Sequence, residues 1–235
     1  MKPHNIALLP AAGVGSRFGA NIPKQYARLL NKPVLQHTID LFAANPRISQ
    51  IAVVVSPNDE WFDDCIALPP QAAVYRVGGN SRAESIANGL TYLLHHKMID
   101  ETDTVLVHDA ARCCLPQTAL NRLLDALEQD HENRGAILAI PVADTLKRQT
   151  PNAPHIAHTV SREYLWQAQT PQAFQAALLH HALQQADWTQ ITDDASAIEL
   201  LGIQPILVEG DSRNIKLTRP DDARLAAYFL QNPDN

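Results

Sequence analysis

Short, unbroken runs of aliphatic residues recur along the chain and predict buried β-strands. Several of these runs are continuous in Val, Ile and Leu rather than alternating with polar residues, which is typical of a sheet that is covered on both faces. The predicted strands are Ile6–Leu9, Ile51–Val55, Val74–Val77, Thr104–Val107, Ala136–Pro141 and Ile206–Val208.

Segments with helical spacing lie between these runs. Ser81 and Glu84 form a predicted capping box before the apolar series Ala83, Ile86, Ala87, Leu90 and Leu94. A second helix is marked by Leu120, Leu123, Leu124 and Leu127. Strands that alternate with helices predict an α/β protein with a mostly parallel sheet.

Residues 142–160 break this pattern. They are polar, contain two prolines and show no helical face. A floppy loop is one interpretation, but loops of this length are uncommon in a compact domain unless they serve a function. We therefore predict an extended arm that pairs with another subunit, protruding from a single domain that spans residues 1–235.

Ligands of parallel α/β sheets bind beyond the carboxyl ends of the strands. That rule places Pro10–Lys24, Gly78–Ser85 and His108–Arg112 on one rim. The first of these segments carries Gly13, Gly15 and Gly19, together with Arg17 and Lys24. Such a loop can cradle anionic oxygens, while the two cations neutralise charge on a phosphate.

The glycine loop differs from two well-known relatives. It lacks the closing Gly-Lys-Ser or Gly-Lys-Thr of a P-loop, and Phe18 stands where the dinucleotide fingerprint needs a small residue. An ordinary glycine-rich turn remains the alternative for the glycines alone, and Arg17 with Pro23-Lys24 favours phosphate binding.

Two acidic segments leave structural alternatives open. Asp109 can hold a ribose hydroxyl or a metal ion and Arg112 can grip a phosphate, but the two can also form a plain surface ion pair. Thr192 is predicted to be a helix N-cap, with Asp193 and Asp194 in the first turn for their favourable interaction with the helix dipole.

Composition narrows the class of protein. The chain has 235 residues, of which 46% are hydrophobic and 19% charged, with a formal net charge of −6. Without a basic stripe we expect no nucleic-acid partner, and without an 18-residue apolar span no membrane partner. Three cysteines, two of them adjacent, form no disulfide framework and favour the cytoplasm, with Cys113 and Cys114 as packing residues. Ten histidines show no metal-binding spacing.

Six segments taken together are far more specific than any one of them. The chain contains PAAGVGSRFGANIPKQY (10–26), GGNSRAESI (78–86), VHDAAR (107–112), TPQAF (170–174), TDDAS (192–196) and NIKLTRPDD (214–222), in this order. It thereby resembles the 2-C-methyl-D-erythritol 4-phosphate cytidylyltransferases of the non-mevalonate isoprenoid pathway over almost its whole length. The resemblance implies a Rossmann-like sheet of the nucleotide-diphospho-sugar transferase type with an extended β-arm for dimerisation.

The resemblance also implies an activity and its participants. CTP and methylerythritol phosphate give the diphosphocytidyl product and pyrophosphate, with Mg2+ mainly on the CTP phosphates. The enzyme would be a cytoplasmic homodimer with a shared active site, its subunits exchanging the arm. Another cytidylyltransferase, such as one acting on ribitol 5-phosphate, is the alternative; a nucleotide-binding module without catalysis is disfavoured by Arg17, Lys24 and Lys216 in one chain.

Site residues follow from the resemblance, position by position. Catalytic roles fall on Arg17, Lys24, Arg162 and Lys216, with Arg162 reaching in from the other subunit. The cytidine pocket would be lined by Ala11, Ala12, Gly13, Gly79, Asn80, Ser85, Asp109 and Ala110. The acceptor would be held by Arg112, Thr145, Arg162, Thr170 and Lys216. Two departures concern this pocket: Asn80 replaces a frequent acid, and Cys113-Cys114 replace a Pro-containing pair.

Overall fold

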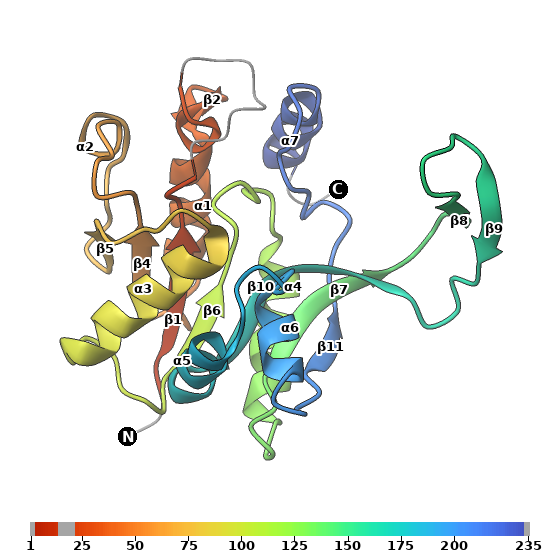
Figure 1. Cartoon of the computed structure of the whole chain (residues 1–235). Helices are drawn as coiled ribbons and strands as arrows, with labels where there is room; N and C mark the ends of the chain where they lie inside the picture. Colours follow the sequence, from red (N-terminus) through yellow and green to blue (C-terminus); the bar gives the residue numbers. More distant parts are fainter. Residues whose placement is uncertain (1–2, 14–21, 233–235) are drawn as a thin grey trace.

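A seven-stranded mixed sheet forms the centre of the molecule, in a computed structural model that describes residues 3–13 and 22–232 (Figure 1). Its spatial order is β11-β7-β10-β6-β1-β4-β5. The strands are β1 (Asn5–Pro10), β4 (Gln50–Val54), β5 (Ala72–Tyr75), β6 (Thr104–Val107), β7 (Ala136–Pro141), β10 (Trp166–Gln175) and β11 (Ile206–Glu209).

Both faces of the sheet are covered, which explains the unbroken aliphatic runs. In β1, Ala7 and Leu9 pack into one hydrophobic cluster, whereas Ile6 and Leu8 pack into a second cluster on the opposite face. The first cluster includes residues of α1 (Val34–Ala43), α2 (Phe62–Cys65) and α4 (Gln117–Glu128). The second includes residues of α3 (Arg82–His95), α5 (Ala176–Gln185) and α6 (Asp194–Glu199).

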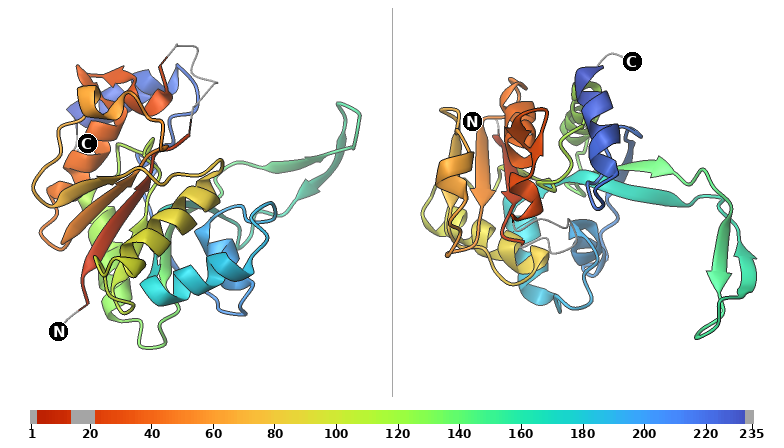
Figure 2. Two further views of the ribbon diagram at one scale, coloured as in Figure 1. Left: turned by 60° about the vertical axis from the view of Figure 1, so that its left-hand side comes forward. Right: turned by 90° about the horizontal axis from the view of Figure 1, so that it is seen from above.

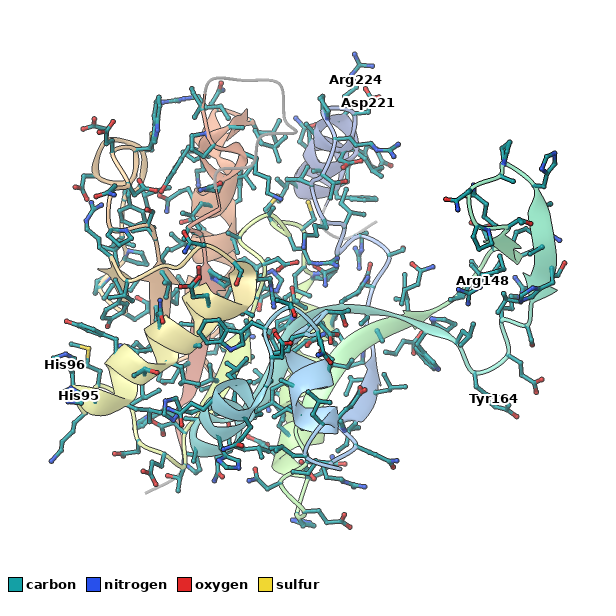
Figure 3. The ribbon with its side chains drawn as sticks, in the orientation of Figure 1. His95, His96, Arg148, Tyr164, Asp221 and Arg224 are labelled. Atoms are coloured by element: carbon teal, nitrogen blue, oxygen red, sulfur yellow. The ribbon has the colours of Figure 1, made fainter. Side chains whose placement is uncertain are left out.

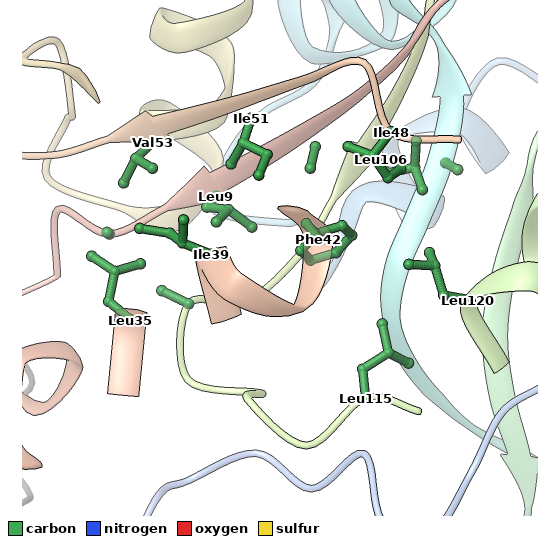
Figure 4. Packing of buried hydrophobic residues seen from close by; sticks show 14 of the residues in the cluster. Leu9, Leu35, Ile39, Phe42, Ile48, Ile51, Val53, Leu106, Leu115 and Leu120 are labelled. Atoms are coloured by element: carbon green, nitrogen blue, oxygen red, sulfur yellow. The ribbon is translucent and has the colours of Figure 1, made fainter. Parts of the chain in front are cut away.

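Figure 4 shows the first cluster, where Ile39 and Phe42 of α1 lie close to Leu9 and Ile51 of the sheet. Phe42, Leu9 and Ile51 are completely buried. Burial of this kind contributes roughly 1.5–3 kcal/mol for each large apolar side chain. The packed sheet is therefore a firm base for the loops that leave its strands.

All six predicted strands are present, although β5 ends at Tyr75 rather than at Val77. The prediction missed β10, which lies between β6 and β7 and runs antiparallel to both. The sheet is thus mixed, and its remaining neighbours are parallel pairs: β1 with β4 and β6, β4 with β5, and β7 with β11. The polar residues of β10 hide it from a search for aliphatic runs.

A smaller cluster packs beside the rim. It joins Leu29 of β2 (Arg28–Leu29) to Ala111, Cys113, Cys114 and Ala226. Ala226 belongs to α7 (Asp222–Gln231), while β3 (Lys32–Pro33) pairs with β2 and the short helix η2 (Lys24–Tyr26) precedes them. Both adjacent cysteines are buried and pack in this cluster, as predicted.

An arm projects away from the sheet (Figures 1 and 2). It leaves β7 and returns into β10, and its hairpin pairs β8 (Leu146–Gln149) with β9 (Ile156–Val160) in antiparallel register. The prediction of an extended segment at 142–160 is confirmed. The return limb continues to Leu165, whose carbonyl oxygen accepts from the Val142 backbone N–H at 3.0 Å near the base of the arm. Among the described residues, no helix is long and apolar enough to cross a membrane.

Candidate active site

A pocket opens at the rim where β1, β6 and the turn before α3 meet. All eight residues predicted for the cytidine pocket line it, together with two predicted catalytic residues, Lys24 and Lys216. The full lining is Pro10, Ala11, Ala12, Gly13, Lys24, Gln25, Gly79, Asn80, Ser81, Arg82, Ser85, Asp109, Ala110, Ala111 and Lys216. Segments far apart in sequence therefore meet at one place, as the strand-end rule requires.

Lys24 is held beside the pocket by its chain neighbours. The buried Gln25 amide donates to the carbonyl oxygens of Ala11 and Gly13, at 2.8 and 3.0 Å. Tyr26 donates its hydroxyl to Asp59 at 2.7 Å. These contacts tie the end of the glycine loop to its start. Gly15, Arg17 and Gly19 lie outside the described residues.

The turn before α3 is shaped by glycines and a serine cap. A Cβ on Gly78 would collide with the Ala12 side chain, so a glycine is needed where the two loops approach. Ser81 accepts from the Glu84 backbone N–H at 3.0 Å, as predicted. Glu84 reaches the backbone N–H of Asn80 at 2.6 Å rather than that of Ser81, so the reciprocal half of the capping box is shifted by one residue.

Ser85 is buried in this turn. Its hydroxyl accepts from Gly79 N–H at 3.1 Å and donates to the Ser81 carbonyl at 2.8 Å. Both of these bonds stabilise the turn that presents Gly79 and Asn80 to the pocket.

Asp109 is the centre of an ion-pair cluster at the floor of the pocket. Its carboxylate accepts from Arg82 Nε at 2.8 Å and Lys216 Nζ at 2.9 Å, and a weaker contact of 3.4 Å joins it to Arg112 Nε. Burial alone would raise the pKa of Asp109, but Arg82, Lys216 and Arg112 hold it well below its ordinary value. The simple surface pair between Asp109 and Arg112 is therefore wrong, because both side chains are largely buried in a larger cluster.

Arg82 and Asp194 are site residues that sequence reasoning missed. Arg82 Nη1 and Nη2 donate to the two carboxylate oxygens of Asp194 at 3.0 and 2.8 Å, a bidentate pair. Asp194 is 1% exposed.

The prediction of Thr192 as the N-cap of α6 is wrong: Asp193 caps α6 in a capping box with Ser196. Asp193 can do so because its carboxylate accepts from the Ser196 N–H at 3.0 Å.

His108 supports the cluster from inside the protein. It is fully buried, and burial lowers its pKa to about 4, so the ring is neutral near pH 7. Nε2 contacts the Arg112 carbonyl at 2.9 Å and must be the donor there, which leaves Nδ1 to accept from the Thr170 hydroxyl at 3.0 Å. Thr170 Oγ1 in turn accepts from the Asp109 N–H at 3.1 Å. A chain of hydrogen bonds therefore fixes this loop.

Three residues of the predicted acceptor set lie together and two do not. Arg112, Thr170 and Lys216 line a second pocket that shares Arg82, Asp109 and Lys216 with the first. Thr145 and Arg162 are exposed in the arm, where the Arg162 guanidinium donates to the Ala143 carbonyl. Figure 3 shows the arm residues Arg148 and Tyr164 far from the sheet.

Within residues 3–13 and 22–232, no group of three or more His, Cys, Asp or Glu side chains is arranged to hold a metal ion. His95 and His96 are exposed at the end of α3 (Figure 3), in agreement with the prediction that they are surface histidines. The Asp109 carboxylate at the pocket is already paired with cations.

Comparison with known proteins gives one consistent result. The family model described as "IspD: 2-C-methyl-D-erythritol 4-phosphate cytidylyltransferase" matches residues 5–232. A protein of that name from Neisseria meningitidis serogroup C / serotype 2a is 51% identical over 230 residues, covering 98% of this chain and 99% of the relative. Its namesake from Chromobacterium violaceum is 52% identical over 229 residues, covering 97% and 99%.

Solved structures agree with the sequence relatives. A crystal structure of 4-diphosphocytidyl-2C-methyl-D-erythritol synthase superposes with a TM-score of 0.86 at 46% identity, covering 98% of this chain and 100% of that one. The Francisella tularensis 2-C-methyl-D-erythritol 4-phosphate cytidylyltransferase gives a TM-score of 0.80 at 32% identity, covering 96% and 99%.

Proposed function

This chain belongs to the family of 2-C-methyl-D-erythritol 4-phosphate cytidylyltransferases, and from that premise we propose how its residues divide the work of the reaction. The enzyme transfers CMP from CTP to 2-C-methyl-D-erythritol 4-phosphate, giving 4-diphosphocytidyl-2-C-methyl-D-erythritol and pyrophosphate in the non-mevalonate pathway. A phosphate oxygen of the acceptor attacks the α-phosphorus of CTP, and the bond to the pyrophosphate oxygen breaks.

The observation that carries the assignment of residues is the pair of adjoining pockets that share Arg82, Asp109 and Lys216. We assign the first pocket to the cytidine and triphosphate and the second to the acceptor. A shared wall brings an acceptor phosphate next to the α-phosphate, which is the positioning that a reaction between two anions needs.

The charges at this wall suit two anionic substrates. Three cations, Arg82, Arg112 and Lys216, meet two carboxylates, Asp109 and Asp194, which leaves one net positive charge in the cluster. Lys216 is 40% exposed and can turn toward an acceptor phosphate. Ionised Asp109 can accept a hydrogen bond from a ribose hydroxyl.

We assign transition-state stabilisation to Lys24, together with Arg17, on the triphosphate side. The attacking phosphate oxygen is already ionised at neutral pH, so the reaction needs no general base. The catalytic task is to hold two anions together and to stabilise charge on the α-phosphate with preorganised cations.

Mg2+ fits this site as a partner of the nucleotide rather than of the protein. Mg2+ commonly binds through substrate phosphates, one or two carboxylates and water. The Asp109 carboxylate is engaged by Arg82 and Lys216, so the triphosphate oxygens would supply most of the ligands. When bound, Mg2+ neutralises charge on the phosphates and on the departing pyrophosphate.

We further propose a homodimer in which Thr145 and Arg162 of the partner subunit complete the acceptor pocket. The arm exposes Ile156 (65%) and Tyr164 (89%), and Trp166 (40%) is exposed where β10 begins. An isolated two-stranded hairpin is at best marginally stable in water. A second subunit would cover these side chains. The whole chain then acts as one cytidylyltransferase domain with 142–160 as its dimerisation arm, and we place it in the cytoplasm, where CTP is made.

Pyrophosphate release tests this assignment directly. With Mg2+ present, CTP and methylerythritol phosphate should react, while ATP, GTP or UTP in place of CTP, and ribitol 5-phosphate or sugar 1-phosphates in place of the acceptor, should give little release. Release with CTP and a different acceptor would contradict the substrate assignment. No release from any pair, by folded protein, would favour a binding module.

A further inference from the structure

Cys113 and Cys114 place two thiols side by side directly behind the catalytic loop. Their sulfur atoms are 3.8 Å apart. They follow Arg112 without a gap, and both are free. The reaction assigned above uses neither of them.

The distance between the two sulfur atoms suits a single soft ion bonded to both of them. Soft ions that bond sulfur at ~2.3 Å hold two thiolates roughly 3.4–3.8 Å apart, for bond angles between about 95° and 109°. Soft thiolate ligands select soft ions over hard ones such as Mg2+. A pair at this distance can chelate one ion with only small side-chain shifts.

A cavity of mixed polarity lies beside the pair, with Lys32, His37, Asp40 and Arg213 among its polar lining. Cys113 and Cys114 line a cavity of about 620 Å³ that lies apart from the two substrate pockets. Leu41, Leu115 and Phe229 form apolar parts of its wall. Its size is within the ~300–1,000 Å³ typical of small-molecule sites.

We propose that Cys113 and Cys114 form a dithiol site for trivalent arsenicals, and that occupation of this site slows CMP transfer. An aryl arsenic oxide reacts with two thiols: two As–S bonds form, the As–O double bond breaks, and the oxygen leaves as water with both thiol protons. The arsenic stays trivalent, so no oxidant or reductant is consumed.

The loop His108–Arg112 connects the two cysteines to the active site. The expected effect on turnover rests on the function proposed above. The peptide before Cys113 belongs to Arg112, whose carbonyl accepts from His108 at 2.9 Å and whose N–H donates to the Asp109 carbonyl at 3.0 Å. The Ala111 carbonyl accepts from Leu217 N–H at 2.9 Å, next to Lys216. A bulky group on the cysteines would therefore displace Arg112, Asp109 and Lys216 together.

Phenylarsine oxide is the probe, added to the reduced full-length protein and followed by native mass spectrometry. We expect one arsenic per chain in the wild type and in the matched control Cys65→Ser, whose thiol lies on α2. Cys113→Ser and Cys114→Ser should each bind at least tenfold more weakly. Equal binding by these variants and the wild type would overturn the site.

A measurement on the wild type alone guards against variants that fold poorly. X-ray absorption at the arsenic edge should show two sulfur ligands per bound arsenic, and fewer than two would contradict a shared dithiol site. Turnover of the adduct should fall at least tenfold and return when a small dithiol removes the arsenic. An adduct with unchanged turnover would overturn the link to the loop. Lack of activity before treatment would instead refute the proposed function and leave the binding result standing.

Discussion

The rim of the sheet and the arm hold the predicted site residues under opposite conditions. At the rim, Asp109 is buried among three cations, and a buried hydrogen-bond chain through His108 fixes its loop. In the arm, Thr145 and Arg162 are exposed, and the hairpin has no core of its own. Folding of one chain therefore orders the rim residues, whereas for Thr145 and Arg162 we propose that a second chain supplies the surroundings.

Removing the arm should have the largest effect, because it takes away the arm's contribution to the site and leaves the rim intact. If residues 146–160 are replaced by a short Gly-Ser linker, we expect a folded monomer with at least ~10³-fold lower turnover, because without the dimer Arg162 of the partner subunit no longer positions the acceptor. Light scattering measures the mass, circular dichroism the fold, and pyrophosphate release the activity. A monomer that keeps wild-type turnover would contradict the arm's role.

Removing one cation from the rim should act on chemistry without changing assembly. Lys24→Ala and Lys216→Ala should each lower turnover by roughly 10²-fold, as expected for loss of one preorganised charge. Lys32→Ala is the matched control, because Lys32 forms an exposed pair with Asp40 and such pairs contribute little. Either rim variant with near-normal turnover in a folded dimer would remove that lysine from the mechanism.

The buried Arg82–Asp194 pair should contribute more to the free energy of unfolding than an exposed ion pair does. Asp194→Asn leaves Arg82 without one of its two carboxylates, and breaking a buried pair costs about 3–5 kcal/mol in the free energy of unfolding. Asp63→Asn breaks the Arg76 pair, whose carboxylate is 76% exposed, and should cost less than about 1 kcal/mol. Urea unfolding compares the two, and similar costs would refute the distinction.

Burial of His108 at the rim should make the free energy of unfolding depend on pH, with a smaller effect than loss of the Arg82–Asp194 pair. Its pKa is about 4 in the folded protein and about 6.5 when unfolded, so the unfolded chain binds more protons between these values. The contribution of His108 to the free energy of unfolding should be complete above pH 6.5. It should fall by up to roughly 3 kcal/mol as the pH drops toward 4. In His108→Gln this part of the slope should vanish. Parallel pH profiles for the two proteins would contradict it.

The same contrast explains how much could be predicted from the sequence. Strands such as β1 and β6 were predictable because burial on both faces requires continuous aliphatic runs, and the strand-end rule then brought Ala11, Gly79 and Asp109 together. The arm was predictable from its polarity and prolines. That the arm pairs with another subunit stays a prediction, because the pattern of one chain does not say what covers an exposed hairpin.

Other features escaped because they depend on contacts across long stretches of sequence. Arg82 and Asp194 are 112 positions apart, and each has a local explanation at the start of its own helix. Only folding shows that they form one buried pair. β10 escaped because its polar residues hydrogen-bond within the site, as Thr170 does with His108, instead of forming an aliphatic run.

The most direct test of a site built from two chains uses heterodimers of two inactive variants. One subunit carries Arg162→Ala and the other Lys24→Ala, each with a different affinity tag so that the heterodimer can be purified. If Arg162 acts in the neighbouring subunit's site, one of the two sites has both residues, and activity should return to about half of the wild-type value per dimer. If verified heterodimers stay as inactive as the parent variants, both residues act within one chain and the shared site is wrong.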